Sequence, residues 1–275
     1  MNKTTNNTIT FIGAGNMTRA LISGLIQNKS NLSIRISDPD ESQLHEIKQS
    51  WDSVNTYTDN SKAIAGADVI VLAVKPQIMK QVCEPLQADL TNQSPLIISI
   101  AAGVSIASLQ LWLGEQNLPI VRCMPNTPAL VQSGMTGLFA NQQVSEDQHN
   151  LSESILRAVG STLWLSSEDK LDAVTAVSGS GPAYYFLVME AMQDAGQKLG
   201  LTAEESRLLV LQTAFGAAKL ALESKDDAGV LRQRVTSKGG TTEAALKTLI
   251  EGGLPELFEN ALKAAENRSV ELKNS

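Results

Sequence analysis

Two glycine-containing segments, one near each end of the chain, have residue types that could bind anions. The first, Gly13–Met17, follows an apolar run and precedes residues with helical spacing. A strand, a glycine turn and a helix bind the pyrophosphate of a dinucleotide, because the helix N-terminus presents unpaired N–H groups and a partial positive charge. Gly13 permits the tight turn and Gly15 lets the backbone approach the phosphates, although Thr18 replaces the third glycine of the usual pattern. The segment predicts a dinucleotide site, with contacts from Gly13, Ala14, Gly15, Asn16 and Met17.

The end of the second predicted strand bears on the choice between NADH and NADPH. Asp38 could accept hydrogen bonds from a ribose 2′-OH and would repel a 2′-phosphate, which argues for NADH. Asp38 could equally serve as an N-cap-like residue of the following helix, and nearby Arg35 and Ser37 could still accommodate a phosphate. The residues alone leave the cofactor preference open.

The second segment, Ser237–Thr242, reads Ser-Lys-Gly-Gly-Thr-Thr and precedes another helical stretch. Backbone N–H groups after glycines at a helix N-terminus can bind a carboxylate, and the Ser237 and Thr242 hydroxyls add side-chain donors. A capped helix with a flexible lead-in explains the same spacing equally well.

Three further segments end predicted strands, where doubly wound sheets bind ligands. Ala73–Pro76 would place Lys75 facing the cofactor, and Ile100–Gly103 has small residues that leave room for a flat nicotinamide ring. Arg122–Pro128 has prolines that rigidify a loop with polar side chains. In the second half, Ser178–Tyr184 breaks one helix and starts the next.

The elements that would position these segments alternate in the first half of the chain. Short apolar runs predict strands, and amphipathic stretches between them predict helices, so we expect parallel β-α-β units with right-handed crossovers. The predicted strands are Thr8–Ile12, Leu32–Ser37, Asp68–Val74, Leu96–Ile100 and Ile120–Met124. The predicted helices are Asn16–Gln27, one opened by Asp40, one from near Pro76, and Ser105–Leu113.

The pattern changes after about residue 145. One last short strand, Ser161–Leu165, is followed only by helical patterns. These are Asp169–Val177, Pro182–Leu199, Ala203–Glu223, Thr241–Ile250 and one from about Pro255, and Thr202 with Glu205 predicts a capping box. We therefore predict an α/β protein with a Rossmann-type doubly wound domain over residues 1–165 and an all-helical domain over residues 166–275.

Composition excludes several classes of partner. The net charge of the 275 residues is −7 with no long basic run, which argues against nucleic acid and anionic membranes. The N-terminal stretch is polar, unlike a secretory signal, so the expected location is the cytoplasm. Cys83 and Cys123 lack metal-ligand spacing and are expected to be buried small hydrophobes in a reducing compartment, and no metal site is expected.

These segments occur in the order seen in pyrroline-5-carboxylate reductases. The resemblance covers nearly the whole chain, and the Gly-Gly-Thr-Thr sequence is its most specific part. It is carried by Gly13–Met17, Ala73–Pro76, Ala101–Gly103, Arg122–Pro128, Ser178–Tyr184 and Ser237–Thr242. The resemblance implies reduction of 1-pyrroline-5-carboxylate to L-proline, the last step of proline biosynthesis, with NADPH as the usual cofactor and NADH admitted by Asp38. It also implies a helical domain that interlocks with a second subunit, an active site at that interface, and dimers that assemble further.

The resemblance also implies roles for individual residues. Thr242 would hydrogen-bond the ring nitrogen as the catalytic group. The substrate would be held by Ser237, Gly240, Thr241 and Thr242, with Glu168 and Ser178 close by. The cofactor would contact Asn60, Ala73, Lys75, Ala102 and Asn126 in addition to Gly13–Met17 and Asp38. The chain departs from the family pattern at Thr18, at Asp38, and at Lys238, where many members have proline.

A protonated imine is already electrophilic, so the reaction needs no strong general acid. The two histidines, His45 and His149, lie in predicted surface helices away from every segment above, in agreement with this. Two alternatives stay open: a reductase of a related cyclic imine, and a non-catalytic NAD(P)H-binding regulator. A β-hydroxyacid type of dehydrogenase is disfavoured, because Tyr184–Asp194 contains no lysine to serve as its catalytic group.

Overall fold

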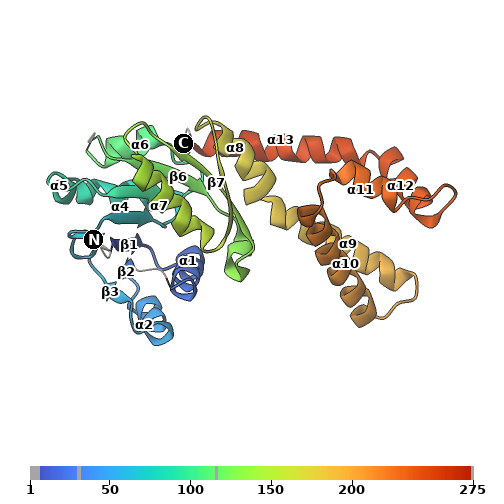
Figure 1. Ribbon diagram of the computed structural model, residues 1–275, viewed down its shortest axis with the longest axis horizontal. Coiled ribbons are helices and arrows are strands. Elements are labelled where there is room, and N and C mark those ends of the chain that lie inside the picture. The colour runs from blue at the N-terminus through green and yellow to red at the C-terminus, as the bar shows by residue number, and fades with distance from the viewer. Residues whose placement is uncertain (1–6, 30–31, 115–116, 274–275) are drawn as a thin grey trace. The chain divides into compact units, whose positions relative to one another are not determined.

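The computed structural model describes residues 7–29, 32–114 and 117–273, so the polar segment 1–6 lies outside it. The chain divides into two compact units (Figure 1). The first runs up to Ser180 and also includes the residues from Ala265 onward, and the second is Gly181–Ala264. The predicted domain division at residue 165 stays a prediction.

The first unit is built on an eight-stranded sheet in the order β3-β2-β1-β4-β5-β6-β7-β8. Its strands are β1 (Asn7–Ile12), β2 (Leu32–Ser37), β3 (Asn55–Tyr57), β4 (Val69–Leu72), β5 (Leu96–Ser99), β6 (Ile120–Met124), β7 (Gly134–Ala140) and β8 (Gly160–Trp164). The strand order reverses between β1 and β4, which is the switch point where doubly wound sheets bind ligands. The sheet confirms the predicted fold class.

Helices cover both faces of this sheet (Figure 1). One face packs on α1 (Asn16–Gln27), α2 (Glu41–Ser50) and α7 (Glu146–Arg157). The other packs on α3 (Asn60–Ile64), α4 (Pro76–Cys83), α5 (Gln87–Leu90) and α6 (Ile106–Trp112). Every residue of β4 and β5 is buried, which explains why both strands are apolar without alternation except at Ser99.

Two strands were not expected from the sequence, and one of them changes the pairing. β3 has only three residues, which is too short to stand out as an apolar run. β7 is antiparallel to β6, whereas only parallel pairs were expected. The link between β6 and β7 holds just the short 3₁₀ turn Thr127–Val131, and a parallel neighbour would need a much longer crossover.

The helices of the second half begin within the first unit. α8 (Lys170–Val174) continues into a π-helical turn, Thr175–Gly179, where one longer helix was predicted. The others are α9 (Gly181–Lys198), α10 (Ala203–Glu223), α11 (Ala228–Arg234), α12 (Thr241–Glu251) and α13 (Leu254–Lys273), of which the short α11 was not predicted. The capping box of Thr202 and Glu205 is confirmed at the start of α10.

The second unit leaves many large apolar side chains exposed in a single chain. On α9, Tyr185 and Phe186 are 70% and 62% exposed. On α10, Leu208, Phe215 and Leu222 are 67%, 62% and 88% exposed. Apolar surface on this scale marks an interaction site on a folded protein.

Both cysteines are free and buried, as expected. Burial raises the pKa of the Cys83 thiol to about 12, and it raises the pKa of Cys123 as well. Among the described residues, no helix is both long and apolar enough to cross a membrane.

Candidate functional site

The glycine loop between β1 and α1 is pinned to the two neighbouring strands. The Gly13 amide donates to the Ser37 carbonyl at 2.8 Å. Gly13 has a φ of +104°, and a Cβ there would lie 2.7 Å from the Ala73 carbonyl oxygen. Only glycine fits this turn, because both the backbone conformation and the space exclude a side chain.

Gly15 meets the opposite situation. A Cβ at Gly15 would meet no protein atom within 4 Å, so it would project outward from the loop. Gly15 is the N-cap of α1 without a side-chain cap, and the first turn has no acidic residue. The first amides of α1 therefore lack intrahelical partners and can receive an anion.

Thr18 explains how the loop tolerates the loss of its third glycine. The side chain is 1% exposed, and its hydroxyl donates to the Gly13 carbonyl at 2.7 Å. The Thr18 side chain is buried between α1 and the sheet, and its hydroxyl hydrogen-bonds the turn at Gly13.

Asp38 is held by backbone amides on both sides. One carboxylate oxygen accepts the Ala14 N–H at 2.8 Å, and the other accepts the Asp40 N–H at 2.9 Å. The N-cap of α2 is Asp40, which accepts the Ser42 N–H, so the alternative that Asp38 caps this helix is wrong. The carboxylate is fixed against the glycine loop.

The two residues considered for a 2′-phosphate differ in availability. The Arg35 guanidinium donates to the carbonyls of Ala63 and Ala65, at 3.2 and 2.7 Å. The Ser37 hydroxyl is buried and has no hydrogen-bond partner among the described residues. The open space at Gly15, the α1 N-terminus without a side-chain cap and the fixed Asp38 carboxylate together fit a dinucleotide.

The other predicted cofactor residues follow strand ends at the same edge of the sheet. Asn60 begins α3 just after β3, and Ala73 follows β4. Lys75 is exposed at the N-cap position of α4, and Ala102 lies half-buried in the loop between β5 and α6. Asn126 follows β6. Carboxyl ends of neighbouring parallel strands share one edge, so the fold brings these residues to the side of the glycine loop.

Asn126 and Ser178 are in direct contact. The Asn126 amide nitrogen donates to the Ser178 carbonyl at 3.1 Å and lies 3.3 Å from its hydroxyl oxygen. The Asn126 amide oxygen accepts the Met135 N–H at 2.8 Å. The amide thereby ties the loop after β6 to the π-helical turn, and π-helical turns are frequent at functional sites.

Glu168 forms a partly buried ion pair that was not predicted. One of its carboxylate oxygens lies 2.6 Å from the Arg122 guanidinium and accepts the Ile106 N–H at 2.8 Å. The Arg122 side chain is 5% exposed. A signal existed in the sequence, because an arginine within the apolar strand β6 needs a carboxylate partner when buried. Its position, 46 residues away, could not be read from the sequence.

Ser237, Gly240, Thr241 and Thr242 cluster in the second unit. Gly239 has a φ of +73°, and a Cβ at Gly240 would lie 2.5 Å from the Ser237 hydroxyl oxygen. Gly240 is the N-cap of α12 without a side-chain cap. The Gly240 N–H donates to the Ser237 carbonyl at 3.0 Å, and the Gly239 N–H donates to Glu243 at 2.7 Å.

The amides of Thr241 and Thr242 open α12 and find no acceptor among the described residues. The tight glycine turn thus leaves two adjacent N–H groups and the half-buried Thr242 side chain at one helix end. Such a terminus can bind a carboxylate.

Neither histidine belongs to these clusters. His45 lies 2.9 Å from the Gln49 amide on α2, and His149 stacks on Trp164 with ring centroids 3.6 Å apart.

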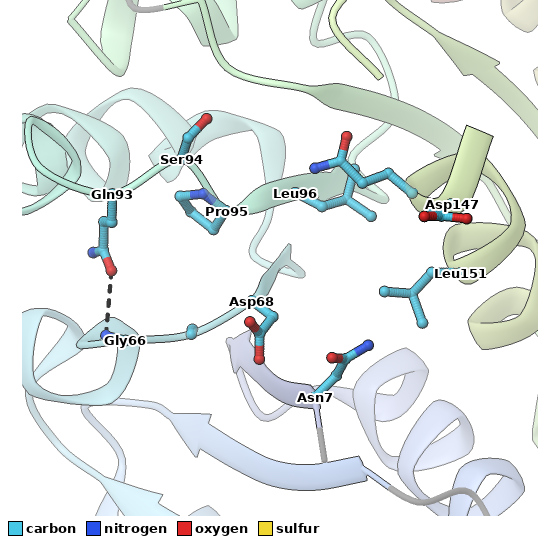
Figure 2. A pocket seen from close by; sticks show the side chains of 11 residues that line it. Asn7, Gly66, Asp68, Gln93, Ser94, Pro95, Leu96, Asp147 and Leu151 are labelled. Atoms are coloured by element: carbon cyan, nitrogen blue, oxygen red, sulfur yellow. Dashed lines mark hydrogen bonds between the residues drawn. The ribbon is translucent and has the colours of Figure 1, made fainter. Parts of the chain in front are cut away.

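An open pocket of about 500 Å³ lies at the opposite edge of the sheet (Figure 2). Asn7, Asp68 and Leu96 line it, where β1, β4 and β5 begin, and Gln93 accepts the Gly66 N–H beside it (Figure 2). No predicted site residue lines this pocket, and parallel sheets bind ligands at the other edge.

Two family models match the chain. The one described as pyrroline-5-carboxylate reductase dimerisation matches residues 168–272. The one described as NADP oxidoreductase, coenzyme F420-dependent, matches residues 8–103.

Individual relatives match over nearly the full length. A pyrroline-5-carboxylate reductase of Pseudomonas aeruginosa is 53% identical over 265 residues, which is 96% of each chain. The solved structure of a pyrroline-5-carboxylate reductase from Coxiella burnetii is 49% identical with a TM-score of 0.92, covering 98% of this chain and 100% of that one. The structure of a Plasmodium falciparum pyrroline carboxylate reductase with NADP bound is 31% identical with a TM-score of 0.84, covering 98% of each chain.

Proposed function

The chain belongs to the pyrroline-5-carboxylate reductase family and reduces 1-pyrroline-5-carboxylate to proline, and from this premise we propose which residues perform each part of the reaction. The observation that supports the assignment most directly is the α12 N-terminus, where the amides of Thr241 and Thr242 have no acceptor within the part of the chain that the structure describes. A small carboxylate-bearing imine is the ligand that this group of donors suits.

Gly13–Met17 and Asp38 bind the adenosine and pyrophosphate part of the cofactor. The first amides of α1 receive the pyrophosphate, and the outward space at Gly15 admits it. Asn60, Ala73, Lys75, Ala102 and Asn126 line the rest of the binding edge.

The proposed cofactor is NADPH, which is supported by the NADP bound in the structure of the Plasmodium relative, and Asp38 keeps NADH competitive. The carboxylate of Asp38 is fixed at the end of β2, where it can accept a ribose hydroxyl and repels a phosphate. Arg35 offers little compensation, because its guanidinium is engaged with two carbonyls.

Thr241 and Thr242 amides and the Ser237 hydroxyl bind the substrate carboxylate. Residue 240 must be glycine for Ser237 to keep its position, since any side chain there would collide with the Ser237 hydroxyl. The Thr242 hydroxyl hydrogen-bonds the ring nitrogen, orients the iminium and steadies the amine as it forms. Glu168 and Ser178 belong to the first unit and support the site indirectly. Glu168 accepts the Ile106 N–H, and the Ser178 carbonyl accepts a hydrogen bond from the Asn126 amide.

The bound nicotinamide supplies the hydride that the imine carbon accepts. The protein's contribution is to hold the imine in an orientation that favours transfer, which can account for on the order of 7 kcal/mol of the barrier. No strong acid is needed, because the substrate is protonated on nitrogen before it reacts.

The chain contains the family's dimerisation domain, and the functional unit is a dimer whose active sites form at the subunit interface. The exposed apolar side chains of α9 and α10 support this, since pairing would bury them. Dimers assemble further into a larger homo-oligomer. The reaction takes place in the cytoplasm, where reduced nicotinamide cofactors are available and the two buried thiols stay reduced.

The role of Thr242 is tested by Thr242→Val, which keeps the shape and removes the hydroxyl. We expect kcat/KM for the imine to fall about tenfold to a hundredfold, mostly through kcat, because a transition-state hydrogen bond is lost. Thr248→Val on the same helix is the matched control, since its hydroxyl bonds only the Ala244 carbonyl. Steady-state kinetics with an unchanged kcat/KM for Thr242→Val would rule out this role.

A further inference from the structure

The last turn of α13 packs directly against the loop between β5 and α6. Gly103 in this loop has a φ of +70°, and a Cβ there would lie 3.3 Å from the Leu272 Cβ and 3.5 Å from the Lys273 nitrogen. Both partners belong to the first compact unit, although α13 begins in the second. The backbone of the loop therefore rests on the end of a distant helix with no side chain of its own between them.

This end of α13 is fastened by two carboxylates at the start of α8. The Ser269 hydroxyl donates to Asp172 at 2.8 Å, and both residues are buried, each with 5% of its surface exposed. The Lys273 ammonium lies 2.9 Å from Asp169 and 3.7 Å from Asp172. The hydrogen bond between Lys273 and Asp169 raises the pKa of the lysine and lowers the pKa of the aspartate.

Glu168, just before Asp169, holds the end of the loop at which α6 begins. Glu168 accepts the N–H of Ile106, the first residue of α6, and the same carboxylate oxygen accepts a hydrogen bond from the Arg122 guanidinium. At the near end, the Ile100 N–H donates to the Leu72 carbonyl at 3.2 Å. The loop from Ile100 to Ile106 is thus bound at both ends and supported in its middle by α13.

Buried charge is a costly way to attach a helix when only stability is required. A buried carboxylate must be paired and hydrogen-bonded to offset its desolvation, and an apolar contact of similar volume is often as stabilising. Directional bonds from Ser269 and Lys273 to Asp172 and Asp169 fix the rotation and height of the last turn as well. This turn is the surface on which Gly103 rests.

We propose that Ser269, Lys273 and Asp172 are positioning residues that hold the loop around Ala102 in the conformation that binds the nicotinamide end of the cofactor. We call these three residues the C-terminal latch. The proposal rests on the proposed function, because that function assigns Ala102 to the cofactor. The latch acts through Gly103 and touches neither substrate nor cofactor.

The test uses Ser269→Ala, Asp172→Asn and the double variant in the full-length protein. Glu271→Gln is the control, because Glu271 lies on the same turn and its pair with Arg268 is exposed. Two quantities are measured: the Kd for NADPH, and the amide hydrogen exchange of residues 100–106 with and without NADPH.

We expect each latch variant to raise the Kd about threefold to tenfold, with kcat at saturating NADPH within about twofold of wild type. The double variant should equal the larger single effect, because both changes release the same helix turn.

Hydrogen exchange separates the two ways of failing. Protection of residues 100–106 by NADPH in the wild type, and faster exchange there in cofactor-free latch variants, is the expected result. If NADPH protects this loop but the latch variants exchange and bind like wild type, or lose only thermal stability, the latch proposal is overturned and the proposed function stands. If NADPH leaves the loop unprotected in the wild type, the assignment of Ala102 to the cofactor fails, and the latch proposal fails with it.

Discussion

Asp38 is the residue on which the proposed choice between NADPH and NADH depends. Two backbone amides, from Ala14 and Asp40, hold its carboxylate against the glycine loop, so its charge has a fixed position. A fixed negative charge at the end of β2 repels a 2′-phosphate and can accept a ribose hydroxyl. We therefore expect the charge of Asp38 to influence the preference between NADPH and NADH.

Asp38→Asn removes this charge and keeps an acceptor for the Ala14 amide. We expect the ratio of kcat/KM for NADPH to kcat/KM for NADH to rise about tenfold, because two unit charges about 4 Å apart interact by about 1 kcal/mol when water screens them. Asp52→Asn, on an exposed residue beyond the end of α2, should leave the ratio as it is. Parallel steady-state assays with the two cofactors give both numbers. An unchanged ratio in Asp38→Asn would show that Asp38 does not face the adenosine ribose.

At the scale of elements, the sequence predicts best where an apolar run ends in a glycine or a polar residue. The bounds of α1, β2, β6 and α10 agree with those predicted, because periodicity and caps mark both ends. β3 and α11 were missed because three or seven residues carry too little periodicity. β7 was missed because glycines interrupt its apolar pattern.

In the candidate site too, some features could be predicted from the sequence and others could not. The turn at Gly13 could be predicted, because strand, glycine and helix follow one another in the sequence. The bonds from Asp38 to Ala14 and from Glu168 to Arg122 join residues far apart along the chain, so only the folded sheet brings them together. Local patterns predict which residues bind, and tertiary packing decides which atoms remain available to do so.

The apolar stripe on α10 gives a prediction at the same scale. Leu208, Phe215 and Leu222 recur at seven-residue spacing, opposite the buried Ser206 and Val210. Phe215→Glu should dissociate the dimer, because a charge would be buried without a partner. If active sites form between subunits, activity should fall in proportion to the loss of dimer.

Sedimentation velocity and activity are measured at matched protein concentrations. Glu223→Gln at the end of the same helix is the control, since its pair with Lys219 is exposed. A fully active monomer would contradict the proposal that the site needs two subunits.

At the scale of the whole molecule, the two predicted sites fall in different compact units. The cofactor residues lie in the first unit, and Ser237–Thr242 lie in the second. Each unit holds a helix that begins at a glycine N-cap without a side-chain cap, α1 and α12, and such a terminus suits an anionic ligand. The proposed sites assign a pyrophosphate to one of these termini and a carboxylate to the other, and the chain contains the family's dimerisation domain.

The central claim is tested most directly by turnover. Purified protein is mixed with racemic 1-pyrroline-5-carboxylate, and the loss of nicotinamide absorbance is followed with NADPH and NADH in parallel. We expect rapid oxidation of NADPH, slower but measurable oxidation of NADH, and proline as the product. Failure to form proline with either cofactor, from a folded dimer that binds both, would contradict the central claim.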